Sequence, residues 1–559
     1  MTTTHDKSKR RHRGVSASHV GAFLGGMVVA TMGLTLFHGT LLHVTQSTNS
    51  FAENQFKAVP SVLEPRSDVH IPLVDEHHTT HEVAGLDCSA HGGPNSTQVT
   101  QELVYWKDLP LDNTYISPLK STTERQYLTF EPDGGGWNNI RMSMETVLAM
   151  AVATGRVLVL PPSQHMYLLG KKSINFGNFF PLEAIAREHA GLEIISMKQF
   201  IEETNGKTYD LKTGKLSPPP GGRTDWDGET SEVKSLLNPW LQSIAPNPDW
   251  NPENCMAAFP KSTDPKDALE LQRIFDEVQK NPPTVEDFIN QPTPVNATVE
   301  ERMREFVAQR KQMCLYTTEL QKAQIIHFNG KRHMGGRLLV HFYAFLFFQD
   351  YKTDLWIKRF IRDHVRYIDD VQCAAARVIE AVRKRSKEKG NGGIFDGFHI
   401  RRGDFQYKKT RVDADEILEV AKDQIPKGTT VYVGTDERKK EFFKVMADYW
   451  DVVYLDDFTN VLDGVQTSHY GMIDQLVTSR SRTFFGCWFS TFTAYITRLR
   501  GYHSQIEEKE GYEMGLLPTT YYYALQEHKT KMHDYWPVKK LYYAREFPVS
   551  WRNIDFDVE

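Results

Sequence analysis

Four short polar clusters in this sequence could do chemistry, because each adjoins an apolar run that is typical of a buried strand. They occupy residues 134–139 (GGGWNN), 399–404 (HIRRGD), 434–437 (GTDE) and 490–493 (STFT). Ligands of open α/β sheets bind beyond the carboxyl ends of the strands. We therefore expect the four clusters to contribute to one binding site.

The arginine pair and the hydroxyl cluster suggest that this site binds an anion. Arg401 and Arg402 end an apolar run, and arginine is a planar, permanently charged residue that can hold phosphate through two hydrogen bonds. Ser490 and Thr491 lie where a helix is predicted to begin, and helix N-termini attract anions. Each feature has a simpler explanation, an ion pair of Arg402 with Asp404 and an ordinary helix N-cap at Ser490. Together they predict a diphosphate ligand such as a nucleotide-sugar.

The glycine cluster would let the backbone approach such a ligand closely, because glycine has no side chain and accepts positive φ angles. A tight strand-to-helix turn is the alternative explanation. The cluster matches neither the GxGxxG fingerprint nor a phosphate-binding Walker loop.

Other classes of site have weaker support in the sequence. A group of histidines lies in a polar segment that we interpret as a histidine-rich stem: His77, His78, His81 and His91. With no CxxC pair and no HExxH motif, no metal site is predicted. The net charge of −5 gives no general attraction to nucleic acid. The five cysteines allow at most two disulfides with one thiol left over, and their pairing stays open.

The elements that would position the clusters alternate between strands and helices, which predicts doubly wound parallel sheets. Residues 127–160 have a strand–glycine loop–helix–strand pattern, and four further strand–helix units follow residue 389. We predict two Rossmann-like domains, at 125–388 and 389–540, that face each other across a cleft, with a C-terminal tail at 541–559. Proline-rich residues 205–300 are predicted to be a loop-rich insertion, and residues 300–325 and 335–385 to be helical.

The N-terminal segment predicts a membrane anchor. Residues 20–44 contain no Asp, Glu, Lys or Arg, and this length can cross a bilayer as a helix. Basic residues concentrate before the span, so residues 1–19 would be a cytosolic tail and residues 45–124 a luminal stem, as in a type II membrane protein. A cleaved signal peptide is the alternative. The sequons at Asn95 and Asn296 suit a glycosylated luminal chain.

The four clusters, in this order, resemble motifs of the protein O-fucosyltransferase family. HIRRGDF is similar to its HxR motif, and GGGWNNIR to its glycine-aromatic-asparagine loop. VYVGTDE and FGCWFSTFTAYITRLRGY resemble its strand ending in TD and its closing hydroxyl-rich segment. The similarity spans about residues 125–505, apart from the proline-rich stretch.

This resemblance implies a GT-B type fold and an inverting, metal-independent transfer of fucose from GDP-fucose, with no cofactor. Arg401 would be catalytic, because a cation beside the β-phosphate gains interaction as charge grows on the leaving GDP. Asp474 would hold the guanine. The substrate-binding residues implied are Gly135, Gly136, Asn138, Asn139, His399, Asp436, Asp474, Ser490, Thr491 and Phe492.

The sequence departs from the family at one position that matters for mechanism. One branch carries a glutamate general base where this chain has Gly135. Asp404, Glu145, or Asn139 acting through water are the remaining candidates for the proton acceptor.

The resemblance does not identify the acceptor. The 205–300 insertion could cover the acceptor groove, so the acceptor stays open between a protein Ser or Thr and a glycan. We expect a single-pass enzyme of the ER or Golgi membrane with a luminal catalytic part. The alternatives are an α-fucosyltransferase that acts on glycans and a non-catalytic luminal protein that binds a sugar-nucleotide.

Overall fold

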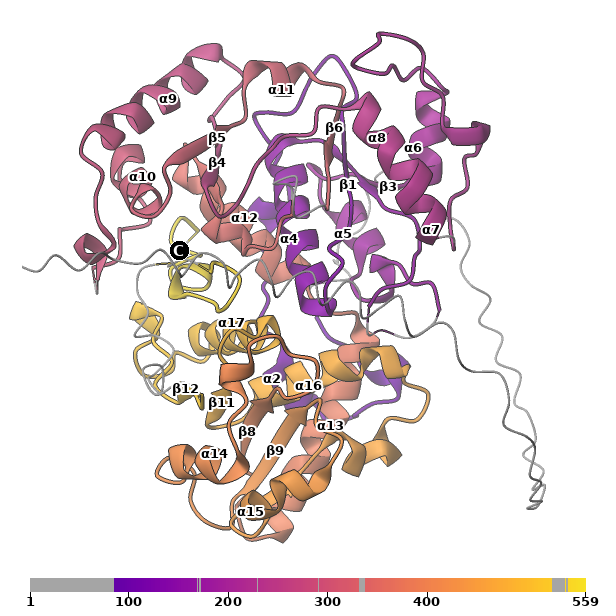
Figure 1. Cartoon of the computed structure of the whole chain (residues 1–559). Helices are drawn as coiled ribbons and strands as arrows, with labels where there is room; N and C mark the ends of the chain where they lie inside the picture. The colour runs from indigo at the N-terminus through magenta and orange to yellow at the C-terminus, as the bar shows by residue number, and fades with distance from the viewer. Residues whose placement is uncertain are drawn as a thin grey trace, which may run out of the picture. The chain divides into compact units, whose positions relative to one another are not determined.

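The computed structural model describes residues 85–558 apart from 168, 170–171, 229, 290, 331–336, 525–537 and 539–540 (Figure 1). These residues form an α/β fold with three sheets, in which all paired strands run parallel. The prediction of an α/β fold with parallel sheets is therefore confirmed. The predicted tail at 1–19, the span at 20–44 and the stem up to residue 84 lie outside the described residues. No helix within the described part has the length and apolar character needed to cross a bilayer.

The first sheet has the strand order β3-β2-β1-β6 and contains the predicted strand–helix–strand unit. Its strands are β1 (Tyr127–Phe130), β2 (Val157–Leu160), β3 (Ile194–Ser196) and β6 (Ile325–Phe328). Helix α4 (Trp137–Thr154) connects β1 to β2 and is buried along nearly its whole length. It ends at Gly155, whose left-handed conformation (φ 65°) favours glycine.

The second sheet has the order β10-β9-β8-β11-β12, which places β8 in the middle. Its strands are β8 (Phe395–Ile400), β9 (Thr430–Thr435), β10 (Asp451–Val453), β11 (Phe484–Gly486) and β12 (Thr520–Tyr522). Its helices are α13 (Asp369–Glu388), α14 (Ala414–Ala421), α15 (Lys444–Ala447), α16 (Tyr470–Ser479) and α17 (Thr491–Ile506). The register pairs Ile400 with Thr435, so the residues that follow β8 and β9 lie side by side.

A third sheet, β5-β4-β7, gives residues 205–300 more regular structure than a loop-rich insertion would have. Its strands are β4 (Cys255–Phe259), β5 (Gln312–Leu315) and β7 (Leu346–Phe348). The amphipathic helices α9 (Pro265–Lys280) and α10 (Val299–Val307) bury their apolar faces against it. The domain limits drawn from the sequence stay a prediction.

Residues 337–348 do not form the predicted helix. They contain a short 3-10 turn at Phe342–Ala344 and then β7, before α12 (Tyr351–His364) begins. The run is apolar on successive residues, and such a run suits a doubly buried strand as well as a buried helix. Residues 300–325 are likewise divided among α10, β5 and α11 (Thr318–Lys322). The remaining helices are α2 (Thr97–Leu103), α3 (Pro110–Asn113), α5 (Leu182–Glu188), α6 (Met197–Thr204), α7 (Thr230–Glu232) and α8 (Asn238–Ile244).

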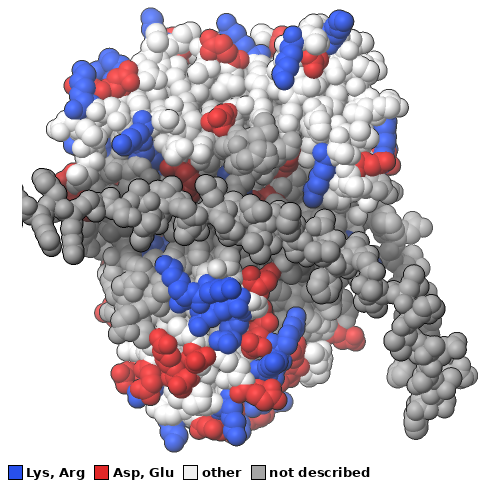
Figure 2. Space-filling view, in the orientation of Figure 1, with Lys and Arg blue, Asp and Glu red and all other residues white. Residues whose placement is uncertain are grey.

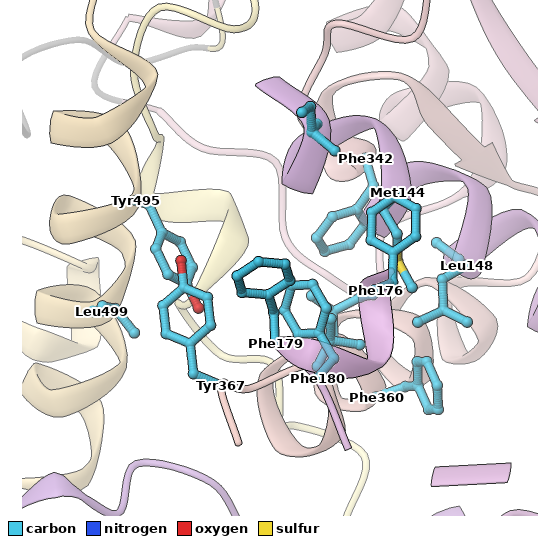
Figure 3. Close-up of a cluster of buried hydrophobic side chains, with 14 of the residues drawn as sticks. Met144, Leu148, Phe176, Phe179, Phe180, Phe342, Phe360, Tyr367, Tyr495 and Leu499 are labelled. Atoms are coloured by element: carbon cyan, nitrogen blue, oxygen red, sulfur yellow. The ribbon is translucent and has the colours of Figure 1, made fainter. Parts of the chain in front are cut away.

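One large apolar core joins the first sheet's helix α4 to α17 of the second (Figure 3). Met144 and Leu148 of α4 face a group of phenylalanines, and Tyr495 of α17 approaches the same group. Tyr495 packs edge-to-face on Tyr367, with ring centroids 5.7 Å apart. This shared core fixes α4 and α17 relative to each other, and both helices begin at predicted site clusters.

Two disulfides cross-link the described chain. Cys88 is bonded to Cys373 and Cys255 to Cys314, and Cys487 is a buried free thiol. The first bond ties the segment before α2 to α13, and the second joins neighbouring strands β4 and β5.

Candidate functional site

Arg401 follows β8 directly and has carboxylates on both terminal nitrogens of its guanidinium group. Its Nη1 donates to Asp436, which follows β9, and its Nη2 donates to Asp404. Asp436 also accepts the backbone N–H groups of Arg402 (2.7 Å) and Gly403 (2.8 Å). Asp436 is therefore held in place by the turn after β8, and it holds Arg401 in turn.

Gly403 is required by this packing. A Cβ atom at Gly403 would lie 2.4 Å from Oδ2 of Asp436, which is closer than any side chain tolerates. The turn thus wraps its backbone around the Asp436 carboxylate.

Arg402 has a different role from Arg401, because its side chain leaves the cluster. Its Nη1 donates to the Val412 carbonyl (2.9 Å), its Nε donates to Glu437 (3.2 Å), and its guanidinium lies 3.9 Å from the Phe442 ring centre. The ion pair with Asp404 that the sequence offered as an alternative is made by Arg401 and not by Arg402.

Asp404 is the exposed partner of Arg401, and a second residue holds it from the other side. Its side chain is 49% exposed, and the Tyr167 hydroxyl donates to its Oδ2 over 2.7 Å. This hydrogen bond lowers the pKa of Asp404 and raises the pKa of Tyr167. Tyr167 could not be identified from the sequence, because it lies in an irregular segment 237 residues away from Asp404 in the chain.

His399 is buried and neutral. Its ring stacks on Phe492 at a centroid distance of 4.3 Å, and its Nδ1 lies 2.7 Å from the Thr493 hydroxyl oxygen. Burial, reinforced by the Arg401 charge, lowers the pKa of His399 to about 3. An imidazole with this pKa carries no proton charge near neutral pH, so it can hydrogen-bond but does not act as an acid.

The starts of α4 and α17 are joined by hydrogen bonds between predicted site residues. The Thr491 hydroxyl donates to Asn139 Oδ1 (2.9 Å), and the Gln475 amide donates to Asn138 Oδ1 (2.8 Å). Ser490 is the N-cap residue of α17, but its side chain makes no capping hydrogen bond, and Gly136 takes the same place at α4. Both helix starts therefore keep backbone N–H groups for another acceptor.

The backbone before α17 is strained. Phe489 has a φ angle of 65°, a region that bulky residues rarely adopt. Such strain is retained where the surrounding structure requires it, and it is common at ligand sites.

Gly135 lies in a closely packed turn, where a side chain would have to displace the side chains of Asn139 and Asp133. A Cβ atom there would lie 2.4 Å from Asn139 Nδ2 and 2.8 Å from Asp133 Oδ1. Asp133 is held by Arg337, whose Nη2 donates to it over 3.0 Å. Arg337 was missed by the sequence analysis, and no pattern around it marked it as a site residue.

Asp474 lies on α16, facing β9. Its Oδ1 accepts a 2.6 Å hydrogen bond from the Tyr432 hydroxyl, and burial raises its pKa to about 7. Glu145, the other acid considered, is 1% exposed and is enclosed by Arg141 and Arg498. Glu145 therefore has no access to a ligand.

The two predicted glycosylation sites lie on the surface. Asn95 and Asn296 are both exposed, as glycosylation requires.

Within residues 85–558, leaving aside the gaps, no group of three or more His, Cys, Asp or Glu could hold a metal ion. Lysine and arginine side chains gather on the visible face above α14 (Figure 2), so an anion would meet positive charge there.

Comparisons with known proteins identify a family. A family model described as GDP-fucose protein O-fucosyltransferase matches residues 127–503. No curated protein matches the chain in sequence.

Several solved structures are similar to part of this chain, and three of them are compared by identity, TM-score and coverage. Fucosyltransferase NodZ from Bradyrhizobium is 16% identical with a TM-score of 0.32, over 68% of this chain and 94% of that one. POFUT1 in complex with GDP is 14% identical with a TM-score of 0.30, over 68% and 96%. A mutant of Arabidopsis thaliana FUT1 in complex with GDP is 11% identical with a TM-score of 0.31, over 74% and 75%. TM-scores below 0.5 do not establish a shared fold.

Proposed function

Since the chain belongs to the GDP-fucose protein O-fucosyltransferase family and is thereby a glycosyltransferase, we propose that it transfers fucose from GDP-fucose to an acceptor hydroxyl. The transfer inverts the anomeric centre and needs no metal ion, within a GT-B arrangement of two facing domains. The acceptor is a Ser or Thr hydroxyl of a protein. The uncharged segment at residues 20–44 and the basic residues before it support an anchor that holds the catalytic part in the ER or Golgi lumen.

Arg401 carries this proposal. When the bond between fucose and the β-phosphate breaks, negative charge grows on the departing GDP. A guanidinium already held at that point gains more interaction in the transition state than in the ground state. The uncapped start of α17 adds backbone N–H donors for the same phosphates.

The two carboxylates on Arg401 would respond differently to the donor. Asp436 also accepts two backbone N–H groups, so displacing it would leave three donors unpaired. Asp404 is half-exposed and loses little when it exchanges Arg401 for water. The donor phosphate therefore replaces Asp404 at Nη2 of Arg401, while Asp436 keeps the guanidinium in position.

Asp404 is then free to accept the proton of the acceptor hydroxyl. Release from the Arg401 charge raises its pKa and makes it a better base. Glu145 is excluded by its burial between arginines. General-base transfer of this kind supplies roughly 10²–10⁴-fold in rate.

The guanine of GDP-fucose would lie between the facing ends of the first and second sheets. Asp474 receives the guanine N1–H and amino group, and His399 with Phe492 forms the wall beside it. Asn138, Asn139, Gly135 and Gly136 border the phosphates and the sugar from the α4 side.

The test uses the full chain in detergent with EDTA, incubated with GDP-fucose, GDP-mannose or a UDP-sugar. Calorimetry measures binding, and the release of free nucleotide measures turnover. We expect selective GDP-fucose binding, and a loss of about 10³-fold in turnover in Arg401→Ala. GDP should still bind to this variant, but more weakly.

Arg402→Ala is the matched control, because its side chain contacts Val412, Glu437 and Phe442 and leaves the site. It should keep most of its turnover and lose thermal stability instead. Full turnover in Arg401→Ala would overturn the mechanism.

A non-catalytic function as a luminal GDP-fucose-binding protein is the second candidate. One observation favours it: this chain has Gly135, in a closely packed turn, where one family branch carries a glutamate base. Binding of GDP-fucose with no transfer to any protein or glycan acceptor would support this candidate. Transfer to a free glycan alone would instead indicate an α-fucosyltransferase.

A further inference from the structure

A large groove lies at the opposite end of the C-terminal sheet from Arg401. Its volume is about 1180 Å³, and it is lined by α2, α13, the start of β8 and the turn before β11. Arg401 follows the last residue of β8, whereas Phe395 in the groove is the first. At about 3.3 Å per residue the two sites are roughly 20 Å apart. The groove is therefore separate from the proposed donor site.

The groove is strongly basic. Eight of its described lining residues are lysine or arginine, and three are glutamate. Some of the cations have acidic partners, such as Arg482 with Asp396 (2.6 Å) and Arg385 with Asp451 (2.7 Å). Lys384 is exposed on α13, and the structure gives it no ion pair with a described residue.

Lys387 has the same character as Lys384. It lies three residues further along α13, so that the two side chains share one helix face, and it is also exposed. The described residues again offer it no ion pair. No described residue forms an ion pair with either lysine, although Glu380 and Glu388 of the same helix also line the groove.

Arg480 adds an unsatisfied guanidinium group to the same wall. Its side chain is only 8% exposed, and its Nη2 is paired with Glu507 over 2.6 Å. Its Nε and Nη1 are buried and have no hydrogen-bond partner among the described residues. Buried donors without acceptors are costly. Arg480 lines the groove, so an oxyanion that binds there as the guanidinium turns toward the groove would meet this requirement.

The other lining groups indicate what kind of anion fits. Ser96, Gln98 and Asn460 offer neutral hydrogen-bonding side chains, which suit hydroxyl groups. The two aromatic lining residues, Phe395 and Phe458, are buried, so neither offers a face on which a nucleobase could stack. The volume exceeds the roughly 300–1,000 Å³ of ordinary small-ligand sites, so the groove has room for several sugar units.

We propose that this groove binds an acidic oligosaccharide, one that carries sulfate, phosphate or carboxylate groups on several sugar units. The cations of α13 and of the turn at residues 480–482 hold its anionic groups, and the neutral side chains bind its hydroxyls. Such a ligand leaves the proposed donor site free, because it occupies the other end of β8.

The experiment measures binding of a heparin-derived octasaccharide to the full chain by calorimetry at two salt concentrations. We expect binding that weakens as salt rises. The double variant K384Q/K387Q should bind about tenfold more weakly, with a smaller salt dependence. The control is K266Q/K444Q, which removes the same charge at exposed lysines of α9 and α15 outside the groove. This control should bind as the wild type does.

Three other outcomes would contradict the proposal. Inorganic sulfate or phosphate that binds as tightly as the octasaccharide would reduce the groove to a simple anion site. Binding to phosphatidylserine vesicles without binding to the octasaccharide would indicate a membrane surface. Equal octasaccharide affinity in wild type and K384Q/K387Q would overturn the assignment to this groove. GDP binding, measured on the same samples, reports on folding and on the donor site independently.

Discussion

Arg401 and Arg402 are adjacent in sequence, yet they have different surroundings. Arg401 lies between two carboxylates, at the end of the middle strand of the C-terminal sheet. Arg402 packs on Phe442 and holds the backbone at Val412. Successive residues of an extended chain point to opposite sides, so only one of two neighbouring arginines can face the site. Arg402 faces away from the site and fixes the turn that holds Arg401.

Asp474 gives the donor site a pH dependence. Burial raises its pKa to about 7, so the carboxylate becomes protonated as pH falls through that value. Only the ionised form accepts both hydrogen bonds from a guanine edge. We expect GDP affinity to fall by up to about tenfold per pH unit below pH 7. Calorimetry between pH 5.5 and 8 measures this effect.

Asp474→Asn separates this titration from that of the GDP phosphates, because the ligand is the same in both proteins. The variant should bind GDP more weakly at pH 8, with a flatter pH profile than the wild type. A profile unchanged by the substitution would place the guanine elsewhere.

At the scale of elements, the sequence patterns correctly predicted the helices and strands that have a regular apolar pattern and clear boundaries. The unit of β1, α4 and β2 is bounded by glycines and prolines, and β8, β9 and β11 are short apolar runs followed by polar clusters. Residues 337–348 were wrongly predicted as helix, because periodicity cannot separate a doubly buried strand from a buried helix. Tyr167 and Arg337 could not be predicted, since their contacts depend on segments distant in the chain.

Arg498 links helix α17 to helix α4, and the starts of these two helices border the candidate site. It donates to Glu145 of α4 (2.9 Å) and to Glu546 (2.8 Å), and all three side chains are buried. Arg498→Met would leave two buried carboxylates short of a partner. Breaking a buried pair in this way costs about 3–5 kcal/mol. Urea unfolding should show a clearly lower midpoint.

Arg273→Met is the comparison for that change. Arg273 is an exposed arginine of α9 paired with Glu270, and exposed pairs contribute about 0–1 kcal/mol. Equal urea midpoints for the two variants would mean that the Arg498 network contributes little to stability.

At the scale of the whole molecule, the two disulfide bonds indicate the cellular compartment in which the chain folds. The Cys88–Cys373 bond closes a loop of 285 residues, and Cys255–Cys314 closes one of 59. In the chain-entropy account, the shorter loop corresponds to a stabilisation of about 4 kcal/mol and the longer loop to about 5.6 kcal/mol. Disulfides persist in oxidising compartments and are rare in the cytosol. The two bonds therefore support the proposed luminal location independently of the predicted anchor.

Thiol counting tests this location directly. Chain made in the secretory pathway, denatured without reduction and alkylated, should carry one label, at Cys487, and five after reduction. The native chain should resist labelling, because Cys487 is buried and burial raises the pKa of its thiol. Mass spectrometry of the peptides reads out each cysteine, and Asn95 and Asn296 can be checked for glycans in the same digest. Three or more labels before reduction would mean that a disulfide does not form, and the support it lends to a luminal enzyme would be lost.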